Sequence, residues 1–204
     1  VSPDPGEQST TCATPTVASD GMSAWCTLTI TSTDADVYTV GVTADLVYTD
    51  TTVTVTTDGE APNSDPAVKT YVDAKIAIEP LTATNLIGEP HTFTVTVWED
   101  AGLGDGYEVA ANELVTVTYE STADGQGTDT CTTGVSGTCT VTVTSGTSGV
   151  ITATASSDVS VGGTVVSVTT DGSDENSGPA VKTYIKVDAK IAIEPLTATN
   201  LIGE

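Results

Sequence analysis

Apolar and polar residues alternate with a period of two along most of the chain. The run HTFTVTVW at 91–98 places Phe93, Val95 and Val97 on one face and threonines on the other. The same alternation recurs at 114–119, 139–145, 150–156 and 164–170. Strict alternation over short runs is typical of antiparallel β-strands with one face buried. No stretch shows a convincing helical periodicity, so we expect strands throughout.

Turn signals separate these runs. Segments rich in Gly and Asp occur at 99–106, 121–127, 144–149, 161–163 and 170–178. The chain is also rich in Thr and Val, whose β-branched side chains suit a pleated, half-buried surface. About seven short strands with turns this frequent predict an all-β fold built as a two-sheet sandwich.

The chain repeats itself at the length of a domain. The sequence DAKIAIEPLTATNLIGE occurs at 73–89 and again at 188–204. Cys26–Tyr71 also aligns without a gap with Cys139–Tyr184, and half of the aligned positions are identical. We therefore expect residues 1–72 to be the C-terminal part of one repeat, 73–187 to be a complete repeat, and 188–204 to be the first strand of a further repeat. Units of this size bury their own cores, unlike the shorter repeats of solenoids.

The segments that join the repeats have no flexible spacer. The first joint, AVKTYVDAKIAIEP at 67–80, contains neither Gly nor Ser, which dominate flexible linkers. The second joint gains two residues, which keeps the alternation of an extended strand and lengthens it by about 6–7 Å. We expect short, stiff connections in which one sandwich runs directly into the next. The predicted joint residues are Tyr71, Val72, Asp73, Tyr184, Ile185, Lys186, Val187 and Asp188.

The four cysteines form two close pairs, Cys12 with Cys26 and Cys131 with Cys139. Cys131 and Cys139 flank a turn-like stretch that can bring two strands side by side, so we predict that each pair is a disulfide that closes a hairpin. Closing such short loops contributes roughly 2.5–3 kcal/mol in the chain-entropy estimate. Zinc is the alternative, but two cysteines per unit and one histidine in the chain leave a four-ligand site incomplete. Disulfides indicate an oxidising compartment and therefore export.

The charge of the chain is strongly negative. It has 28 acidic residues against five basic ones, a net charge of −23. A nucleic-acid-binding protein needs basic groups to neutralise phosphates, so we exclude nucleic acid as a partner. No apolar run is long enough to cross a bilayer, and we expect no direct membrane insertion by this segment. Acidic loops with Asp100, Asp105, Asp171 and Asp174 offer oxygen ligands of the kind calcium takes, but they do not match EF-hand spacing, so no metal or cofactor is predicted.

Two other features have a functional and a structural interpretation. His91 is the only histidine, and no nucleophile or partner acid around it shows a triad-like arrangement, so a structural hydrogen bond explains it better than catalysis. Trp25 and Trp98, with Tyr71 and Tyr184 near the joints, suggest an aromatic binding patch. Packing at core edges and between domains explains these rings more simply, because it needs no ligand.

Two stretches carry a family resemblance. AVKTYVDAKIAIEPLTATNLIGEPHTFTVTVWEDAG at 67–102 and TCTTGVSGTCTVTVTSGTSGVITATAS at 130–156 resemble bacterial immunoglobulin-like repeats of very long surface proteins. They are similar, more distantly, to the stalk domains of invasin and intimin. The resemblance covers nearly the whole chain, although TGVSGTC at 133–139 departs from the pattern usual in that family. It implies tandem immunoglobulin-like β-sandwich domains joined end to end, and it carries no catalytic residues.

These observations favour a non-enzymatic structural role. We expect an exported protein, extracellular or on the cell surface, whose repeats form a stiff stalk, an extracellular filament or an adhesin shaft. Its partners are the neighbouring repeats of the same chain and, in a fibre, other copies whose edge strands pair. The alternative is an immunoglobulin-like module that recognises a glycan or a host protein through its loops. The low aromatic content of 4% argues against that alternative.

Overall fold

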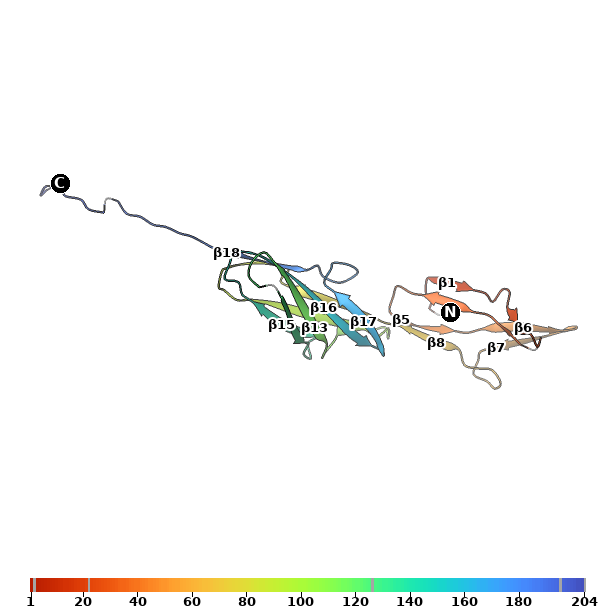
Figure 1. Ribbon diagram of the computed structural model, residues 1–204. Helices are drawn as coiled ribbons and strands as arrows, with labels where there is room; N and C mark the ends of the chain where they lie inside the picture. Colours follow the sequence, from red (N-terminus) through yellow and green to blue (C-terminus); the bar gives the residue numbers. More distant parts are fainter. Residues whose placement is uncertain (2, 22, 126, 195, 204) are drawn as a thin grey trace.

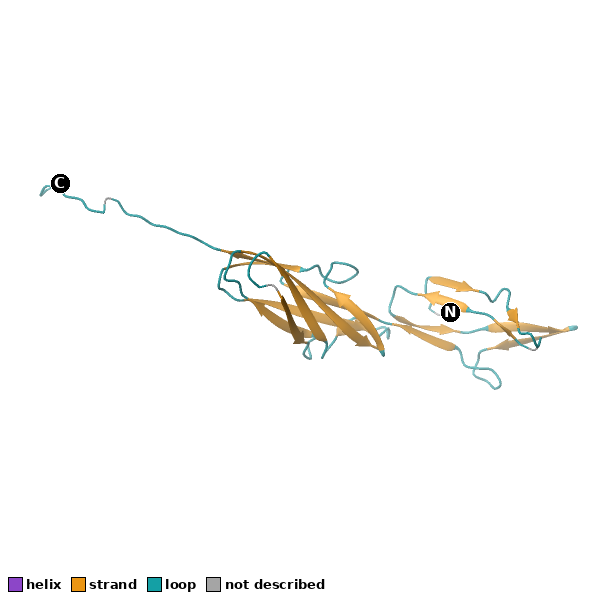
Figure 2. Cartoon of the chain, viewed as in Figure 1, coloured by secondary structure: helices purple, strands orange, loops and turns teal. Residues whose placement is uncertain are grey.

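The computed structural model describes residues 1, 3–21, 23–125, 127–194 and 196–203. The described residues form strands and loops, as Figure 2 shows, and none of them forms a helix long and apolar enough to cross a membrane. Three regions follow one another along the long axis of the molecule (Figure 1). They are a loosely built N-terminal region, a complete sandwich and an extended C-terminal segment.

The complete sandwich begins at the first copy of the repeated sequence. Its smaller sheet is centred on β11, which pairs antiparallel with all three other strands of the sheet. The strands of this sheet are β9 (Asp73–Glu79), β11 (His91–Asp100), β12 (Glu108–Val109) and β15 (Thr138–Val143).

The larger sheet is centred on β16, the longest strand. It has the order β10-β18-β16-β13-β14, and β17 also pairs with β16. Every pairing in it is antiparallel except that of β10 with β18, which is parallel. The strands are β10 (Thr82–Leu86), β13 (Leu114–Ser121), β14 (Gly127–Thr132), β16 (Gly149–Val161), β17 (Thr164–Thr169) and β18 (Ala180–Ile185).

This division of strands is that of an immunoglobulin-like sandwich. In that fold, strands A, B and E form one sheet and strands C, F and G form the other. Here β9, β11 and β15 take the first three places, and β13, β16 and β18 take the second three. The consecutive strands β9 and β10 belong to opposite sheets, so the first part of the repeat contributes to both.

Alternation along the strands produces the core between the sheets. Phe93, Val95 and Val97 are fully buried, as the sequence predicts for this face, while the threonines between them are half-buried or exposed. β16 and β9 bury every second residue in the same way. Apolar area removed from water contributes about 25 cal/mol per Å². The other fully buried aliphatic side chains with zero exposure are Ile76, Ile78, Val115, Val117, Ile151, Ala153, Ala155, Val159 and Ala180.

The N-terminal region has strands but almost no core. Its strands are β1 (Glu7–Thr10), β2 (Thr16–Val17), β3 (Ala24–Trp25), β4 (Leu28–Thr31), β5 (Asp36–Val40), β6 (Thr43–Tyr48), β7 (Thr51–Thr56) and β8 (Ala67–Tyr71). They form four separate two-stranded ladders, β1-β4, β2-β3, β5-β8 and β6-β7. Among the described residues of this region, Tyr38 is the one large apolar side chain that is buried. The alignment of the repeats explains why, because residues 1–72 contain no counterparts of β9, β11 and β13.

The C-terminal segment contains the second copy of the repeated sequence. Its described residues, 188–194 and 196–203, lie in no strand and extend away from the sandwich in Figure 1. Residues 195 and 204 of this copy lie outside the described residues. The assignment of 188–204 to a further repeat therefore stays a prediction, as do the other two domain boundaries.

Candidate functional site at the joint between units

The first joint is a nearly continuous strand. β8 ends at Tyr71 in the N-terminal region, and β9 begins at Asp73 in the complete sandwich, so Val72 alone separates them. Up to Tyr71 the chain pairs with β5, and from Asp73 it pairs with β11. Backbone bonded in a ladder on both sides of one residue has few free torsions, which limits bending at this point.

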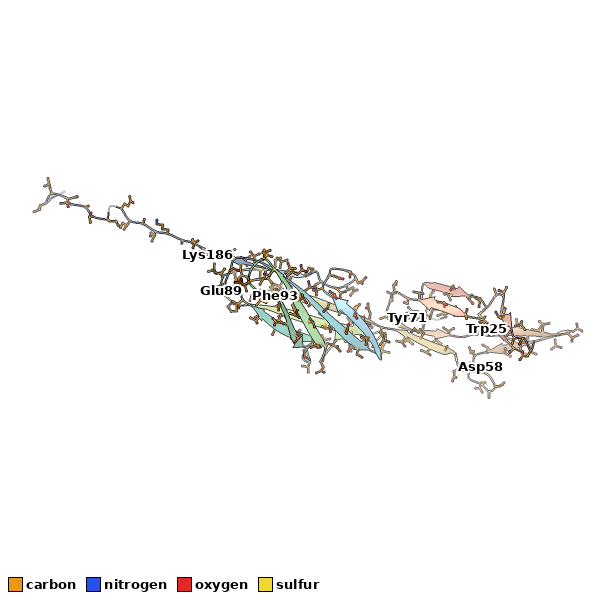
Figure 3. All side chains as sticks on the ribbon, in the orientation of Figure 1. Trp25, Asp58, Tyr71, Glu89, Phe93 and Lys186 are labelled. Atoms are coloured by element: carbon orange, nitrogen blue, oxygen red, sulfur yellow. A yellow bond between two sulfur atoms is a disulfide. The ribbon has the colours of Figure 1, made fainter. Side chains whose placement is uncertain are left out.

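A tyrosine anchors the last strand on the N-terminal side. Tyr71 donates its hydroxyl hydrogen to the carbonyl of Ile30 over 2.6 Å, and its ring meets Tyr38 edge to face at 5.6 Å between centroids. Lys69 places its ammonium 5.2 Å from the centre of the same ring. Figure 3 labels Tyr71 at the end of the N-terminal region that faces the sandwich. The strand therefore enters the joint in a fixed position.

Two turns of the sandwich close around the joint. Val72 packs against the sandwich core, and a Cβ added to Gly162 in the β16–β17 turn would lie 3.4 Å from its Cγ1. Gly102 has a positive φ of 71° and faces the N-terminal region. A Cβ at Gly102 would lie 3.0 Å from the Asp36 nitrogen and would collide with the Tyr71 carbonyl oxygen. Only glycine allows this close approach of the two units.

A small polar cluster lies on the sandwich side of the joint. Asp73 accepts the Tyr107 hydroxyl at 2.6 Å and the Ala74 amide at 2.7 Å. Lys75 lies 3.8 Å from the centre of the Tyr107 ring and forms a 2.7 Å ion pair with Glu175. Burial, and then the bond to Asp73, raises the pKa of Tyr107 well above its usual value, so the phenol keeps its donor hydrogen at physiological pH.

Gly102 and Tyr107 are joint residues that the sequence did not reveal. They lie some 30 positions from Tyr71 and Asp73, and only the fold brings them together. The glycine-rich stretch GLGDGY at 102–107 is the one available signal, because repeated glycines in a turn often indicate close backbone approach. From the sequence alone, this stretch is expected to be a turn that carries acidic side chains, and its contact with the joint is not evident.

The second predicted joint differs from the first. Tyr184 is buried and donates to the Val143 carbonyl at 2.9 Å, as Tyr71 does to Ile30 in the aligned position. Beyond Ile185, where β18 ends, the chain leaves the sheet. Val187 is exposed, and Lys186 forms an ion pair of 3.4 Å with Asp188 between two solvent-exposed side chains. Exposed pairs of this kind contribute little to stability.

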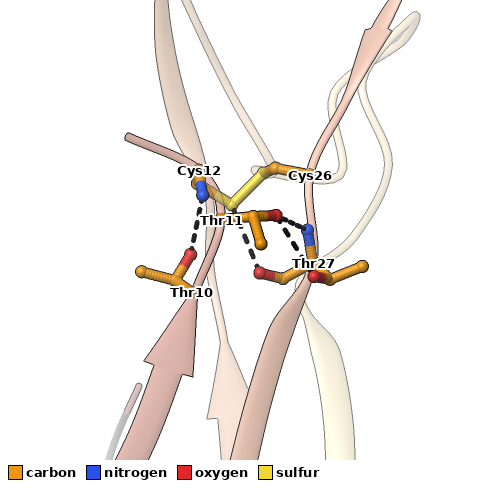
Figure 4. Close-up of a disulfide and its surroundings, with 5 residues drawn as sticks. All are labelled: Thr10, Thr11, Cys12, Cys26 and Thr27. Carbon is orange, nitrogen blue, oxygen red and sulfur yellow. Dashed lines mark hydrogen bonds between the residues drawn. A yellow bond between two sulfur atoms is a disulfide. The ribbon is translucent and has the colours of Figure 1, made fainter. Parts of the chain in front are cut away.

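Both cysteine pairs are joined in the structure. Cys12 and Cys26 adjoin the ends of β1 and β4, where Thr11 and Thr27 exchange backbone and side-chain hydrogen bonds of 2.9–3.2 Å (Figure 4). Cys131 lies on β14 and Cys139 on β15, which belong to opposite sheets. The second disulfide therefore links the two sheets across the sandwich. The expectation that it closes a hairpin is wrong, because the turn at 133–137 carries the chain from one sheet to the other.

The acidic side chains of two loops form hydrogen bonds within their own turns. Among the described residues no three potential ligands lie close enough to hold a metal ion. Asp100 accepts the Gly102 amide, and Asp171 accepts the amide and hydroxyl of Ser173. These are turn-forming bonds, and the bonds to Ser173 lower the pKa of Asp171. Asp105 and Asp174 are exposed in the same two loops.

The remaining candidates lie apart from the joint. Trp25 is exposed and lies well away from Tyr71 in Figure 3, so these two rings form no common patch. His91 meets Phe93 edge to face at 4.7 Å, and its Nε2 is buried without a hydrogen-bond partner. Burial, followed by the charge of Lys182, lowers the pKa of His91. Lys182 itself is fully buried, its Nζ has no hydrogen-bond partner, and desolvation lowers its pKa.

Comparisons with known proteins give a likeness to solved structures. No family model matches the chain. No curated protein matches it. Among solved structures it is similar to the D00-D0 domain of intimin, at 17% sequence identity and a TM-score of 0.34, over 88% of this chain and 78% of that one. The assignment of the immunoglobulin-like fold rests on the strand order of the sandwich itself.

Proposed function

We propose that this chain is a structural segment of an exported protein, in which sandwiches follow one another end to end as a stiff stalk, filament or adhesin shaft. The observation that carries the proposal is the first joint. One residue separates β8 from β9, and that residue is packed against the sandwich core. A flexible tether would instead use a solvated, Gly- or Ser-rich spacer.

The contacts around the joint support this role. Gly102 fits against the ends of β8 and β5, and Tyr107 holds the first residue of β9. The Gly102 contact joins the two units, so bending at Val72 must break it, whereas the Tyr107 bond lies within the sandwich and fixes the start of β9. Elongated proteins that bear load or hold a distant tip need this resistance to bending. Catalysis and small-molecule binding do not require it.

The disulfides support the proposed location. Each cysteine pair is bonded within its own region of the chain, and no free cysteine is present among the described residues. Structural disulfides persist outside the reducing cytosol. The net charge of −23 is compatible with a soluble shaft exposed to solvent, because like charges oppose non-specific association.

Small-angle scattering of the chain in dilute solution tests the proposal. We expect a rod-like distance distribution that one arrangement of the N-terminal region and the sandwich reproduces. As a matched variant, Gly102→Val adds a side chain where no Cβ fits and should broaden the distribution without unfolding the sandwich. Gly104→Val lies in the same turn with open space around its Cβ position and serves as the control. A broad, hinge-like distribution for the unmodified chain would refute a stiff shaft.

A further inference from the structure

The chain enters and leaves the sandwich through strands that are hydrogen-bonded to each other. It enters through β9 and, after crossing between the sheets, continues as β10. It leaves through β18, which ends at Ile185. β10 and β18 pair in parallel, from Thr82 opposite Val181 to Leu86 opposite Ile185. The entry and exit strands are therefore joined directly by one ladder.

Tension along the chain pulls these two strands from opposite ends. β10 runs towards Glu89, which Figure 3 labels together with Lys186 at the end of the sandwich remote from Tyr71. A pull on Val72 therefore loads β10 at its first residue, whereas a pull on Lys186 loads β18 at its last residue. Because the two strands are parallel, these forces slide one strand along the other.

Sliding loads all hydrogen bonds of the ladder together. The bonds of a parallel ladder are evenly spaced along both strands, so no bond can break alone while its neighbours hold the register. When both strands are pulled at the same end, the bonds instead open one after another. Forced unfolding is governed by the unfolding rate, and breaking several bonds in one step slows that rate. The arrangement of β10 and β18 is therefore the one that resists tension best.

Both strands are also anchored in the sandwich. β18 lies between β10 and β16, and Tyr184 donates its hydroxyl hydrogen to the Val143 carbonyl of the opposite sheet at 2.9 Å. Upstream of β10, the whole of β9 pairs with β11, from Asp73 opposite Asp100 to Glu79 opposite Thr94. Neither strand can peel away from the ladder without breaking these bonds as well.

We propose that β10 and β18 form a mechanical clamp that carries tension through the sandwich. The load passes from one strand to the other across their shared ladder. It does not depend on β14, on β15 or on the disulfide that links them. This inference rests on the proposed structural role, since it states how a shaft built from such units withstands a pull.

Single-molecule pulling on the full chain in two directions tests the clamp. Handles on Lys69→Cys and Lys186→Cys load the ladder in shear, and handles on Glu89→Cys and Lys186→Cys pull both strands at the same end. All three positions are exposed, and the four native cysteines are bonded, so thiol-reactive handles attach only to the added residues. At equal loading rate, the first direction should need at least about threefold more force. Equal forces, or a larger force in the second direction, would overturn the proposal.

Two proline substitutions one residue apart give a second test. The Ile87 amide donates to the Ile185 carbonyl at 3.0 Å. Bonds of a parallel ladder recur at every second residue of a strand, so the Ala83 amide faces β18 and the Thr84 amide faces away from it. Since proline has no amide hydrogen, Ala83→Pro removes a bond of the clamp and Thr84→Pro removes none.

The two variants should differ in strength under shear. Ala83→Pro should lower the unfolding force by at least about a third, and Thr84→Pro should leave it unchanged, because only the first shortens the bonded ladder. Urea unfolding shows whether each variant folds. Equal losses of force from the two variants would refute the clamp. If Ala83→Pro does not fold, the comparison of pulling directions decides, because it leaves the ladder intact.

The Cys131–Cys139 disulfide separates mechanical from thermodynamic stability. Replacing both cysteines with alanine should destabilise the sandwich in urea but leave the shear force unchanged, because an interaction that is intact in the transition state does not alter the unfolding rate. A marked fall in force would show that the load passes through β14 and β15 and would contradict the proposal. A weak clamp would leave the stiffness of the first joint untouched, because scattering in solution measures bending and applies no tension.

Discussion

Residues 73–89 and their copy at 188–204 have the same sequence and different structures. The first copy forms β9 and β10 and buries Ile76 and Ile78, whereas the described residues of the second copy lie exposed and outside any strand. The difference lies in what surrounds each copy. The first meets β11 and the Asn176–Ser177 loop, and the second meets neither. Alternation thus gives a segment the capacity to form a strand, and partner strands decide whether it does.

The N-terminal region and the sandwich show the same dependence on partner strands. The N-terminal region and the sandwich share local hydrogen bonds, such as Thr54 with Asp45 and Ser167 with Asp158, both 2.6 Å. They differ in long-range packing, since the N-terminal region lacks a second layer to cover its apolar faces. Leu46 is 43% exposed there, whereas its counterpart Val159 in the sandwich is 0% exposed. Sequence similarity between the repeats therefore reproduces the β5-β8 and β6-β7 ladders, which correspond to β16-β18 and β16-β17. It reproduces neither the core nor the pairing of β1 with β4, whose counterparts β14 and β15 lie in opposite sheets.

The largest expected difference in stability is between substitutions of Ile76 and Ile191, which occupy equivalent positions in the two copies. Ile76→Ala should lower the free energy of unfolding of the sandwich by about 2–5 kcal/mol, because it removes a fully buried side chain. Ile191→Ala should leave it unchanged. Urea unfolding in dilute solution measures both. Equal effects would mean that the second copy also packs against the sandwich.

The two disulfides offer the next comparison. Replacing Cys131 and Cys139 together with alanine removes the link between the sheets and should cost the sandwich about 2–3 kcal/mol. The same change at Cys12 and Cys26 should leave sandwich unfolding within about 0.5 kcal/mol of the unmodified protein, because that disulfide lies in a separate region. Calorimetry resolves the two. A large effect of the Cys12–Cys26 change would show that the regions unfold together.

Both regions contain the motif AVKTY, and replacing its lysine should change stability less and in the opposite direction. Lys182 is buried without a hydrogen-bond partner, while its counterpart Lys69 is exposed. Lys182→Met should stabilise the sandwich by about 1 kcal/mol, since it removes the cost of burying a charge. Lys69→Met should have little effect on stability. Destabilisation by Lys182→Met would indicate that the ammonium has a favourable role in the folded protein.

Substitution of His91 should have the smallest effect on stability, and it should affect the sandwich alone. Its pKa is lowered from 6.5 in the folded state, so between the two pKa values the unfolded chain binds more protons. The stability linked to His91 is therefore complete above about pH 6.5 and is lost as the pH falls below it. Against the unmodified protein, His91→Asn should show a shallower loss of stability between pH 7 and pH 5, by less than about 1 kcal/mol. Parallel curves for the two proteins would contradict this.

The sequence predicted the all-β fold and the positions of its strands well. The strand at 91–98 and its buried face follow directly from alternation, and the turns follow from Gly and Asp. The direct joint at 71–73 was also evident from its apolar composition. These features depend on local patterns of side chains.

Other features could not be predicted, because they depend on contacts between distant residues. The parallel pairing of β10 with β18 joins positions about a hundred residues apart. The burial of Lys182 reflects an inward-facing strand position that is usually apolar. The inter-sheet path of the Cys131–Cys139 disulfide depends on which sheet each strand joins. Gly102 belongs to the joint only because the fold places its turn against β5 and β8.

Amide hydrogen exchange in dilute solution tests the central claim most directly, namely that partner strands and not sequence make one copy part of a rigid joint. Peptides that begin upstream of Val72 or of Lys186 distinguish the two identical copies. We predict slow exchange across the first joint and through β9, and exchange at the rate of an unfolded peptide from 188 onward. Exchange at the first joint as fast as in the C-terminal segment would contradict the account.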